Sequence, residues 1–174
     1  MDIRRGSLTV SASSIPADQT IMRGETSIAY LNLVLTAGSA ENLRVIYVKL
    51  IRNSSGIGSD DDITNVALYD GSYRLTTKET LSGGYIIFDG GNMLSADGID
   101  IPRGQQKIIT VKADVPLTAI VGHQNSLGVV SIWTLGTTSN TNPESTLIGG
   151  PGSCVGVNTS CNSAPDAYEA SISQ

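Results

Sequence analysis

Few of the side chains that enzymes commonly use for catalysis or cofactor binding occur in this chain of 174 residues. It contains one histidine and two cysteines, and aromatic residues make up 5% of it. Charged residues make up 16%, whereas about 25% is usual for soluble domains. No apolar run reaches the roughly 18 residues that a membrane-spanning helix needs. We therefore expect neither an enzyme nor a membrane span.

Clusters of basic residues are also lacking. The formal net charge is −5 at neutral pH. Arg4 and Arg5 form the only basic doublet, and a solvated chain end explains it more simply than a binding site does. Because an acidic surface repels nucleic acid and anionic lipid, we expect no nucleic-acid partner.

The cysteines bear on the cellular compartment. No apolar segment follows residues 1–6, so the chain is either cytosolic or a mature or excised form without a signal peptide. Cys154 and Cys161, seven positions apart, are too few for a metal site even with His123. Their spacing also differs from that of a Cys-x-x-Cys redox pair. A local disulfide fits best, and it predicts an oxidising, extracellular environment.

What the chain does contain is a succession of β-strand patterns. Between residues 6 and 135, apolar and polar residues alternate in short segments that turn signals separate. The two long apolar segments, at 28–37 and 42–52, could also form helices, but Gly38 and the residues at 53–56 limit them to the length of strands. The expected strands are residues 7–13, 28–37, 42–52, 65–70, 73–77, 85–88, 108–115 and 127–135.

The composition changes after Leu135. Residues 136–166 are mostly Gly, Thr, Ser, Asn and Pro, which predicts a long loop that the disulfide would order. Residues 167–173 alternate again and predict a terminal strand. We expect one domain over residues 1–174, with its main body at 6–135 and its last strand at 167–174. The strand number and the short turns favour an antiparallel sandwich of two sheets.

Four segments carry a family resemblance. They are Gly-Ser-Leu-Thr-Val-Ser at 6–11, Thr-Ala-Gly-Ser-Ala-Glu-Asn-Leu-Arg-Val at 36–45, Asn-Val-Ala-Leu-Tyr-Asp-Gly at 65–71 and Ile-Pro-Arg-Gly-Gln-Gln-Lys-Ile-Ile-Thr-Val-Lys-Ala-Asp-Val at 101–115. In this order they resemble Ig-like β-sandwich modules of prokaryotic cell-surface proteins, as found in surface layers, adhesins and extracellular filaments. The resemblance implies an all-β Ig-like sandwich of about 8–9 strands, a structural or adhesive role and no catalytic residues.

Three adjacent carboxylates, Asp60, Asp61 and Asp62, are the candidate metal ligands. They could recruit Ca²⁺, but EF-hand spacing is absent, so a solvated acidic turn is the interpretation we favour. Asp97 and Asp100 present the same two possibilities. No other metal and no cofactor are expected. We expect His123 in a turn, since its sequence neighbours supply neither an acid nor a nucleophile.

A surface glycan is a candidate partner if aromatic side chains form an exposed platform. At this low aromatic content, we expect the core and strand pairing to need most of them. The candidates are Tyr30, Tyr47, Tyr73, Tyr85, Trp133 and Tyr168.

The two terminal strands suggest a different role. A short amphipathic strand at a chain end can leave its own sheet and complete that of a neighbour. The donor side chains would be Leu8, Val10 and Ala12, or else Tyr168, Ala170 and Ile172. Ordinary pairing within the domain is the alternative. Our first hypothesis is an extracellular structural protein that assembles with copies of itself, for example into a filament by strand donation. The alternative is a carbohydrate- or surface-binding module that uses loops at one end of the sandwich.

Overall fold

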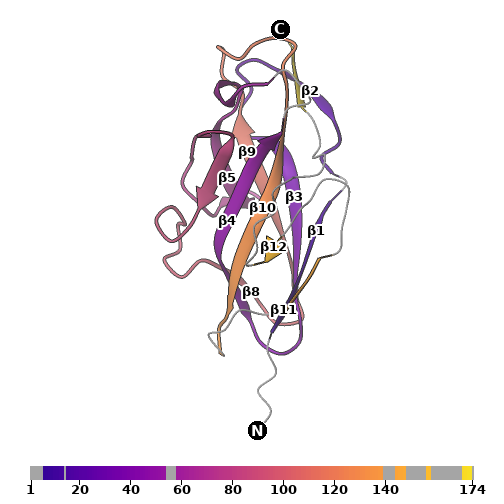
Figure 1. Ribbon diagram of the computed structural model, residues 1–174, viewed down its shortest axis with the longest axis vertical. Helices are drawn as coiled ribbons and strands as arrows, with labels where there is room; N and C mark the ends of the chain where they lie inside the picture. Colours follow the sequence, from indigo (N-terminus) through magenta and orange to yellow (C-terminus); the bar gives the residue numbers. More distant parts are fainter. Residues whose placement is uncertain are drawn as a thin grey trace.

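The computed structural model describes residues 6–13, 15–53, 58–138, 144–147, 156–157 and 170–173. These residues form two sheets whose strands run close to the long axis of the molecule (Figure 1). Besides the strands, they contain a single-turn 3-10 helix, η1 (Asp60–Asp62). The predicted all-β sandwich is confirmed. The strands are β1 (Ser7–Ala12), β2 (Gln19–Met22), β3 (Ile28–Ala37), β4 (Leu43–Asn53), β5 (Thr64–Asp70), β6 (Tyr73–Arg74), β7 (Tyr85–Phe88), β8 (Ile99–Ile101), β9 (Gln106–Asp114), β10 (Gln124–Gly136), β11 (Glu144–Leu147), β12 (Gly156–Val157) and β13 (Ala170–Ser173).

The two sheets differ in strand order. One has the order β11-β1-β3-β9-β5-β6. The other has the order β2-β13-β10-β4-β7, with β12 beside β10 and β8 beside β4. Most neighbours are antiparallel, but β1–β11, β10–β12 and β2–β13 are parallel pairs. Each parallel pair includes a strand from beyond residue 136, so the last part of the chain adds strands to both sheets.

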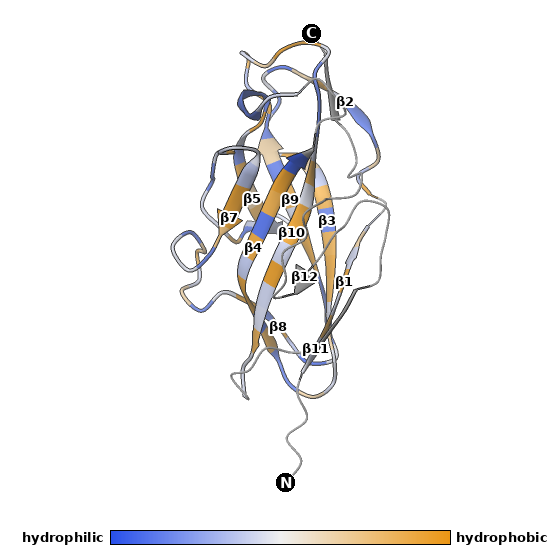
Figure 2. Cartoon of the chain, in the orientation of Figure 1, coloured by the Kyte–Doolittle hydropathy of each residue, from blue (hydrophilic) through white to orange (hydrophobic). Residues whose placement is uncertain are grey.

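The core lies between the sheets and consists of the inward-facing residues of each strand. Leu31, Leu33 and Leu35 of β3 face it from one sheet, and Val48 and Leu50 of β4 face it from the other. Each of the five is at most 3% exposed. Burying a side chain of this size contributes about 1.5–3 kcal/mol relative to exposure. Figure 2 shows the alternation of hydrophobic and hydrophilic residues along β4 that results.

A β-bulge in β10 decides which of its residues face outward. The register with β4 shifts between Val129 and Ser131, so Val130 is an extra residue in β10. Such a residue reverses the inward and outward positions that follow it. Ile132 therefore faces the core and is 0% exposed, whereas Trp133 faces outward and is 44% exposed. A second irregularity follows Trp133.

Both terminal strands complete the chain's own sheets, which is the alternative to strand exchange. β1 pairs with β3 over five residues and with β11 over four. Leu8 and Val10 are buried in the core at 0% and 1% exposed, and Ala12 is partly buried against it. β13, which contains Ala170 and Ile172, pairs with β10 and β2.

Some features expected near the C-terminus lie outside the described residues. These are Cys154 and Cys161 with their predicted disulfide, and Tyr168. Within residues 136–166, for which we expected a loop, β11 and β12 are strands. No helix in the described part of the chain is long and apolar enough to cross a membrane.

Candidate functional site

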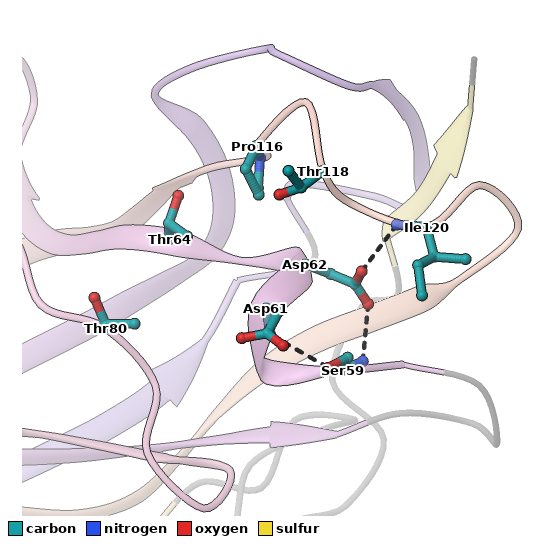
Figure 3. A pocket seen from close by; sticks show the side chains of 8 residues that line it. All are labelled: Ser59, Asp61, Asp62, Thr64, Thr80, Pro116, Thr118 and Ile120. Carbon is teal, nitrogen blue, oxygen red and sulfur yellow. Dashed lines mark hydrogen bonds between the residues drawn. The ribbon is translucent and has the colours of Figure 1, made fainter.

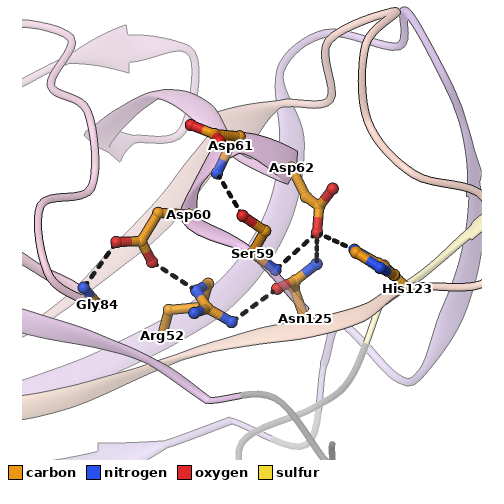
Figure 4. Close-up of polar contacts among 8 residues, drawn as sticks. All are labelled: Arg52, Ser59, Asp60, Asp61, Asp62, Gly84, His123 and Asn125. Carbon is orange, nitrogen blue, oxygen red and sulfur yellow. Dashed lines mark hydrogen bonds and ion pairs between the residues drawn. The ribbon is translucent and has the colours of Figure 1, made fainter. Parts of the chain in front are cut away.

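The three aspartates at 60–62 form η1, and their carboxylates point in different directions (Figure 4). Ser59 caps the helix, because its Oγ accepts a hydrogen bond from the backbone N of Asp61 at 3.4 Å. In return, Asp62 Oδ2 accepts a hydrogen bond from the backbone N of Ser59 at 2.8 Å. This reciprocal pair is a capping box, which fixes the entry of the chain into the helix.

Asp62 is buried, with 1% of the residue exposed, and it accepts four hydrogen bonds. Besides Ser59 N, the donors are Ile120 N at 3.1 Å, His123 Nδ1 at 2.7 Å and Asn125 Nδ2 at 3.0 Å. An ionised carboxylate only accepts, so the proton of this contact is on Nδ1 of His123. Burial raises the pKa of Asp62, but these hydrogen bonds outweigh it and hold the pKa below its usual value.

Asp60 lies in a second, adjoining set of contacts. Its Oδ1 accepts a hydrogen bond from Arg52 Nε at 2.7 Å, and its Oδ2 accepts one from the backbone N of Gly84 at 2.8 Å. Burial raises the pKa of Asp60, but these bonds and the charge of Arg52 lower it below its usual value. Arg52 also donates to Asn125 Oδ1 at 3.1 Å, which links this set to that of Asp62. We call the two sets together the aspartate network, most of which Figure 4 shows; its residues are Arg52, Ser59, Asp60, Asp62, Gly84, Ile120, His123 and Asn125.

The contacts of the aspartate network involve two of the three candidate Ca²⁺ ligands. Protein donors already occupy the carboxylates of Asp60 and Asp62, and only Asp61 is exposed. Asp62 is not part of a solvated turn, because the fold buries it. Asp97 and Asp100 both contact Arg44, at 3.5 and 3.0 Å. Among the described residues, no group of three or more His, Cys, Asp or Glu side chains could hold a metal ion.

His123 was expected in a turn without an acid partner, and the structure places it against Asp62. The two are 61 positions apart, so no local pattern joins them. One local signal for the role of Asp62 was present. Ser59 and Asp62 have the spacing of a capping box, which predicts a helix start at this point.

Beside η1 lies a pocket of about 390 Å³, which we call the end pocket (Figure 3). Asp61 and three threonines, Thr64, Thr80 and Thr118, supply polar groups to its lining. Pro116 and Ile120, from the loop between β9 and β10, add apolar surface. Asp62 joins the two sides, since it binds the backbone N of Ser59 in η1 and that of Ile120 in the loop.

A second candidate site is the outer surface of strands β10, β4 and β7. Tyr47 of β4 and Trp133 of β10 are directly opposite in register and stack with ring centroids 4.5 Å apart. On the next strand, Tyr85 carries Lys49 Nζ over its ring, 4.4 Å from the centroid. Ile87 is opposite Lys49 in register. We call these five residues the aromatic face.

The aromatic face is exposed although it is rich in apolar atoms. Trp133, Ile87 and Tyr85 are 44%, 42% and 40% exposed. Desolvation raises the pKa of the Tyr47 hydroxyl, and the charge of Asp89 raises it further. An exposed group of large apolar side chains on one sheet surface is characteristic of interaction sites.

The other aromatic candidates lie elsewhere. Tyr30 is 2% exposed and belongs to the core, where burial raises its pKa, and the charge of Asp62 adds to this. Tyr73 is 70% exposed but lies on β6, in the other sheet. The core and strand pairing were expected to need most aromatics: Tyr30 lies in the core, and Tyr47 and Trp133 stack as a cross-strand pair, although Trp133 and Tyr85 are also exposed.

Comparisons with known proteins give a distant structural likeness. No family model matches the chain, and no curated protein matches it. The third ScaB cohesin of R. flavefaciens, solved in complex with a group 1 dockerin, is 14% identical over 96% of this chain and 95% of that chain, with a TM-score of 0.35. The seventh ScaB type I cohesin of Pseudobacteroides cellulosolvens is 11% identical over 95% and 92%, with a TM-score of 0.38. The OlpC cohesin in a type I cohesin–dockerin complex of Clostridium thermocellum is 8% identical over 98% and 94%, with a TM-score of 0.30.

Such low identities and TM-scores do not assign this chain to the cohesin family. The three structures are cohesins rather than the surface-layer or adhesin modules that the sequence resemblance indicated.

Proposed function

We propose that this protein is a non-enzymatic extracellular module that binds a partner protein through its aromatic face. The observation that carries the proposal is the position of Trp133, Tyr85 and Ile87, which share one sheet surface and are each at least 40% exposed. Tryptophan and tyrosine dominate the binding energy of protein interfaces, because they bury a large area at a small cost in conformational entropy.

The chemistry of the aromatic face indicates the kind of partner. Lys49 lies among its apolar residues, opposite Ile87 and Ser131 in register. Among the described residues, no carboxylate forms an ion pair with Lys49. A partner that buries this face therefore needs apolar side chains opposite Trp133 and Ile87 and a carboxylate opposite Lys49.

A carbohydrate platform has less support at this face. The Tyr47 and Trp133 rings stack on each other with 24° between their planes, so each ring keeps only one face on which a sugar could lie. Strand donation also has less support. Leu8 and Val10 are already buried in the core of their own domain, where β1 pairs with β3 and β11, so donating this strand to a neighbour would bury no additional apolar surface.

The test uses a photo-crosslinking amino acid, p-benzoylphenylalanine, at Ile87 of the full chain. The protein is irradiated among the secreted proteins of its own organism, and the crosslinked partner is identified by mass spectrometry and purified. The control carries the same amino acid at Ile108, which is 50% exposed on the other sheet. A second copy of this chain would be recognised as a crosslinked homodimer.

Binding of the purified partner is then measured by calorimetry with single variants. We expect Trp133→Ala to weaken binding at least tenfold, the loss that is typical of an interface hot spot. Lys49→Glu should weaken it as well by reversing the charge. Equal capture from Ile87 and Ile108, or an affinity that Trp133→Ala leaves unchanged, would refute the aromatic face as the docking site.

A further inference from the structure

We propose that the end pocket is a second binding site, separate from the aromatic face, and that it takes an alkylammonium group such as a lysine side chain. The pocket, of about 390 Å³, lies where η1, the start of β5 and the loop between β9 and β10 meet (Figure 3). Its volume falls within the range of about 300–1,000 Å³ that is usual for ligand pockets.

The pocket carries negative charge without a compensating cation. Two of its lining residues, Asp61 and Asp62, are acidic, and none of the others is Lys, Arg or His. The carboxylate of Asp62 is already hydrogen-bonded to His123, Asn125 and the backbone N–H groups of Ser59 and Ile120. In the described part of the chain, by contrast, no side-chain or backbone donor contacts the Asp61 carboxylate. A concave site with a free carboxylate concentrates negative potential and attracts cations.

The polar groups around Asp61 fit an ammonium ion in particular. Thr80 and Thr118 are both exposed residues of the lining, and no described residue forms a hydrogen bond with either hydroxyl, so both hydroxyls are open to a ligand. An ammonium group has three N–H donors and no acceptor, so one carboxylate and two hydroxyls can satisfy it. Pro116 and Ile120 supply the apolar surface along which a hydrocarbon stem can lie. A neutral sugar would leave the charge of Asp61 uncompensated.

Hydrogen bonds within the protein already hold two sides of the end pocket. Asp62 binds the backbone of η1 at Ser59 and the backbone of the loop at Ile120, so one buried carboxylate holds both sides. The loop is closed on itself, because Ala119 N donates to Pro116 O at 3.0 Å. A preformed site avoids the entropic cost of ordering loops on binding.

The experiment is a titration of the full-length ¹⁵N-labelled protein by two-dimensional NMR. The probe is Nα-acetyl-lysine N-methylamide, and the comparison is the uncharged Nα-acetyl-norleucine N-methylamide. We expect saturable shifts at the amides of Asp61, Thr118 and Ile120 with the lysine probe, and none with norleucine. n-Butylamine as a third ligand distinguishes the source, because binding as tight as that of the lysine probe would indicate a free amine rather than a peptide side chain.

Two variants test the roles of single lining residues. Asp61→Asn removes the charge and should weaken binding of the lysine probe at least tenfold. Thr118→Val removes one acceptor without changing the shape of the side chain and should weaken binding of the probe less. Asp97→Asn is the matched control, since it removes an exposed carboxylate that contacts Arg44 rather than the pocket. The proposal is overturned if the wild type shows no saturable shift, if norleucine binds as well as lysine, or if Asp61→Asn binds like Asp97→Asn.

Discussion

Replacing Asp62 with asparagine tests whether one buried carboxylate holds this end of the sandwich together. The substitution keeps the shape of a side chain that is 1% exposed, so it opens no cavity. It removes the charge and turns one acceptor oxygen into an N–H donor. Asp62 Oδ2 accepts three hydrogen bonds and Oδ1 accepts one, from Ile120 N. The best asparagine rotamer therefore keeps three bonds with a neutral acceptor and leaves Ile120 N without one.

The magnitude follows from these contacts. A hydrogen bond to a charged group is worth about 1.5–3 kcal/mol and a neutral one about 0.5–1.5 kcal/mol, so three weakened bonds lose about 3 kcal/mol together. A backbone N–H without a partner costs about 1–3 kcal/mol more. Relief from burying a charge opposes both losses. We expect the free energy of unfolding to fall by about 2–4 kcal/mol, a large part of the roughly 5–15 kcal/mol that is typical of a domain.

The assay is urea unfolding followed by tryptophan fluorescence. The chain has one tryptophan, Trp133, which lies on the aromatic face and not in the aspartate network, so it reports on the whole domain. The midpoint should fall while the m-value stays unchanged. Asp61→Asn is the control in the same helical turn, and as an exposed substitution it should change the stability by less than about 0.5 kcal/mol.

Two results would refute this reasoning. The first is a loss below about 1 kcal/mol for Asp62→Asn, since that would mean that its four contacts contribute no more than one ordinary hydrogen bond. The second is an equal loss for Asp61→Asn and Asp62→Asn, which would indicate a general effect of charge in η1 rather than the buried contacts.

Three further predictions concern other parts of the molecule. Because the pKa of Asp62 is lowered in the folded protein, its contribution to stability is present above the ordinary carboxylate pKa of about 4 and is lost as the pH falls through the folded value. The melting temperature of Asp62→Asn should therefore decrease less steeply on acidification than that of the wild type, and parallel curves would contradict this. Gly136→Ala should cost about 1–3 kcal/mol in chemical denaturation, because its Cβ would overlap the carboxylate of Glu41, which is 6% exposed; an unchanged midpoint would show that Glu41 can move aside. Trp133→Ala removes the stack on Tyr47 and should cost only about 0.5–1.5 kcal/mol beyond the lost buried area, with an unchanged circular dichroism spectrum; loss of the folded spectrum would mean that Trp133 serves the core.

The strands of the main body could be predicted because their alternation extends over many residues. The segment expected at 28–37 matches β3 (Ile28–Ala37), and that at 85–88 matches β7 (Tyr85–Phe88). β8 (Ile99–Ile101) and β2 (Gln19–Met22) were missed, since β8 has only three residues and β2 buries only Ile21, so neither shows a clear period of two. The segment 73–77 was predicted too long, because β6 ends at Arg74.

The aspartate network could not be predicted in the same way. Periodicity tells which face of a strand is buried, but not which loops meet at the end of a sandwich. Asp62 and His123 come together because β5 and β10 both begin at this end, and that depends on the order of strands in two sheets. Three adjacent aspartates look alike in the sequence, but the capping box and the donors of Ile120, His123 and Asn125 hold Asp62 inward, whereas Asp61 lines the end pocket.

The aromatic face depends on a single residue that no pattern in the sequence identifies. Leu127 and Val129 face the core, so strict alternation along β10 would place Trp133 in the core as well. The extra residue Val130 reverses this order, and Ile132 takes the inward position instead. A tryptophan that alternation assigns to the core is thereby moved to the surface, beside Tyr47 on the neighbouring strand. Because a bulge disrupts the ladder locally and fixes the direction of the side chains after it, this one serves to present Trp133 outward.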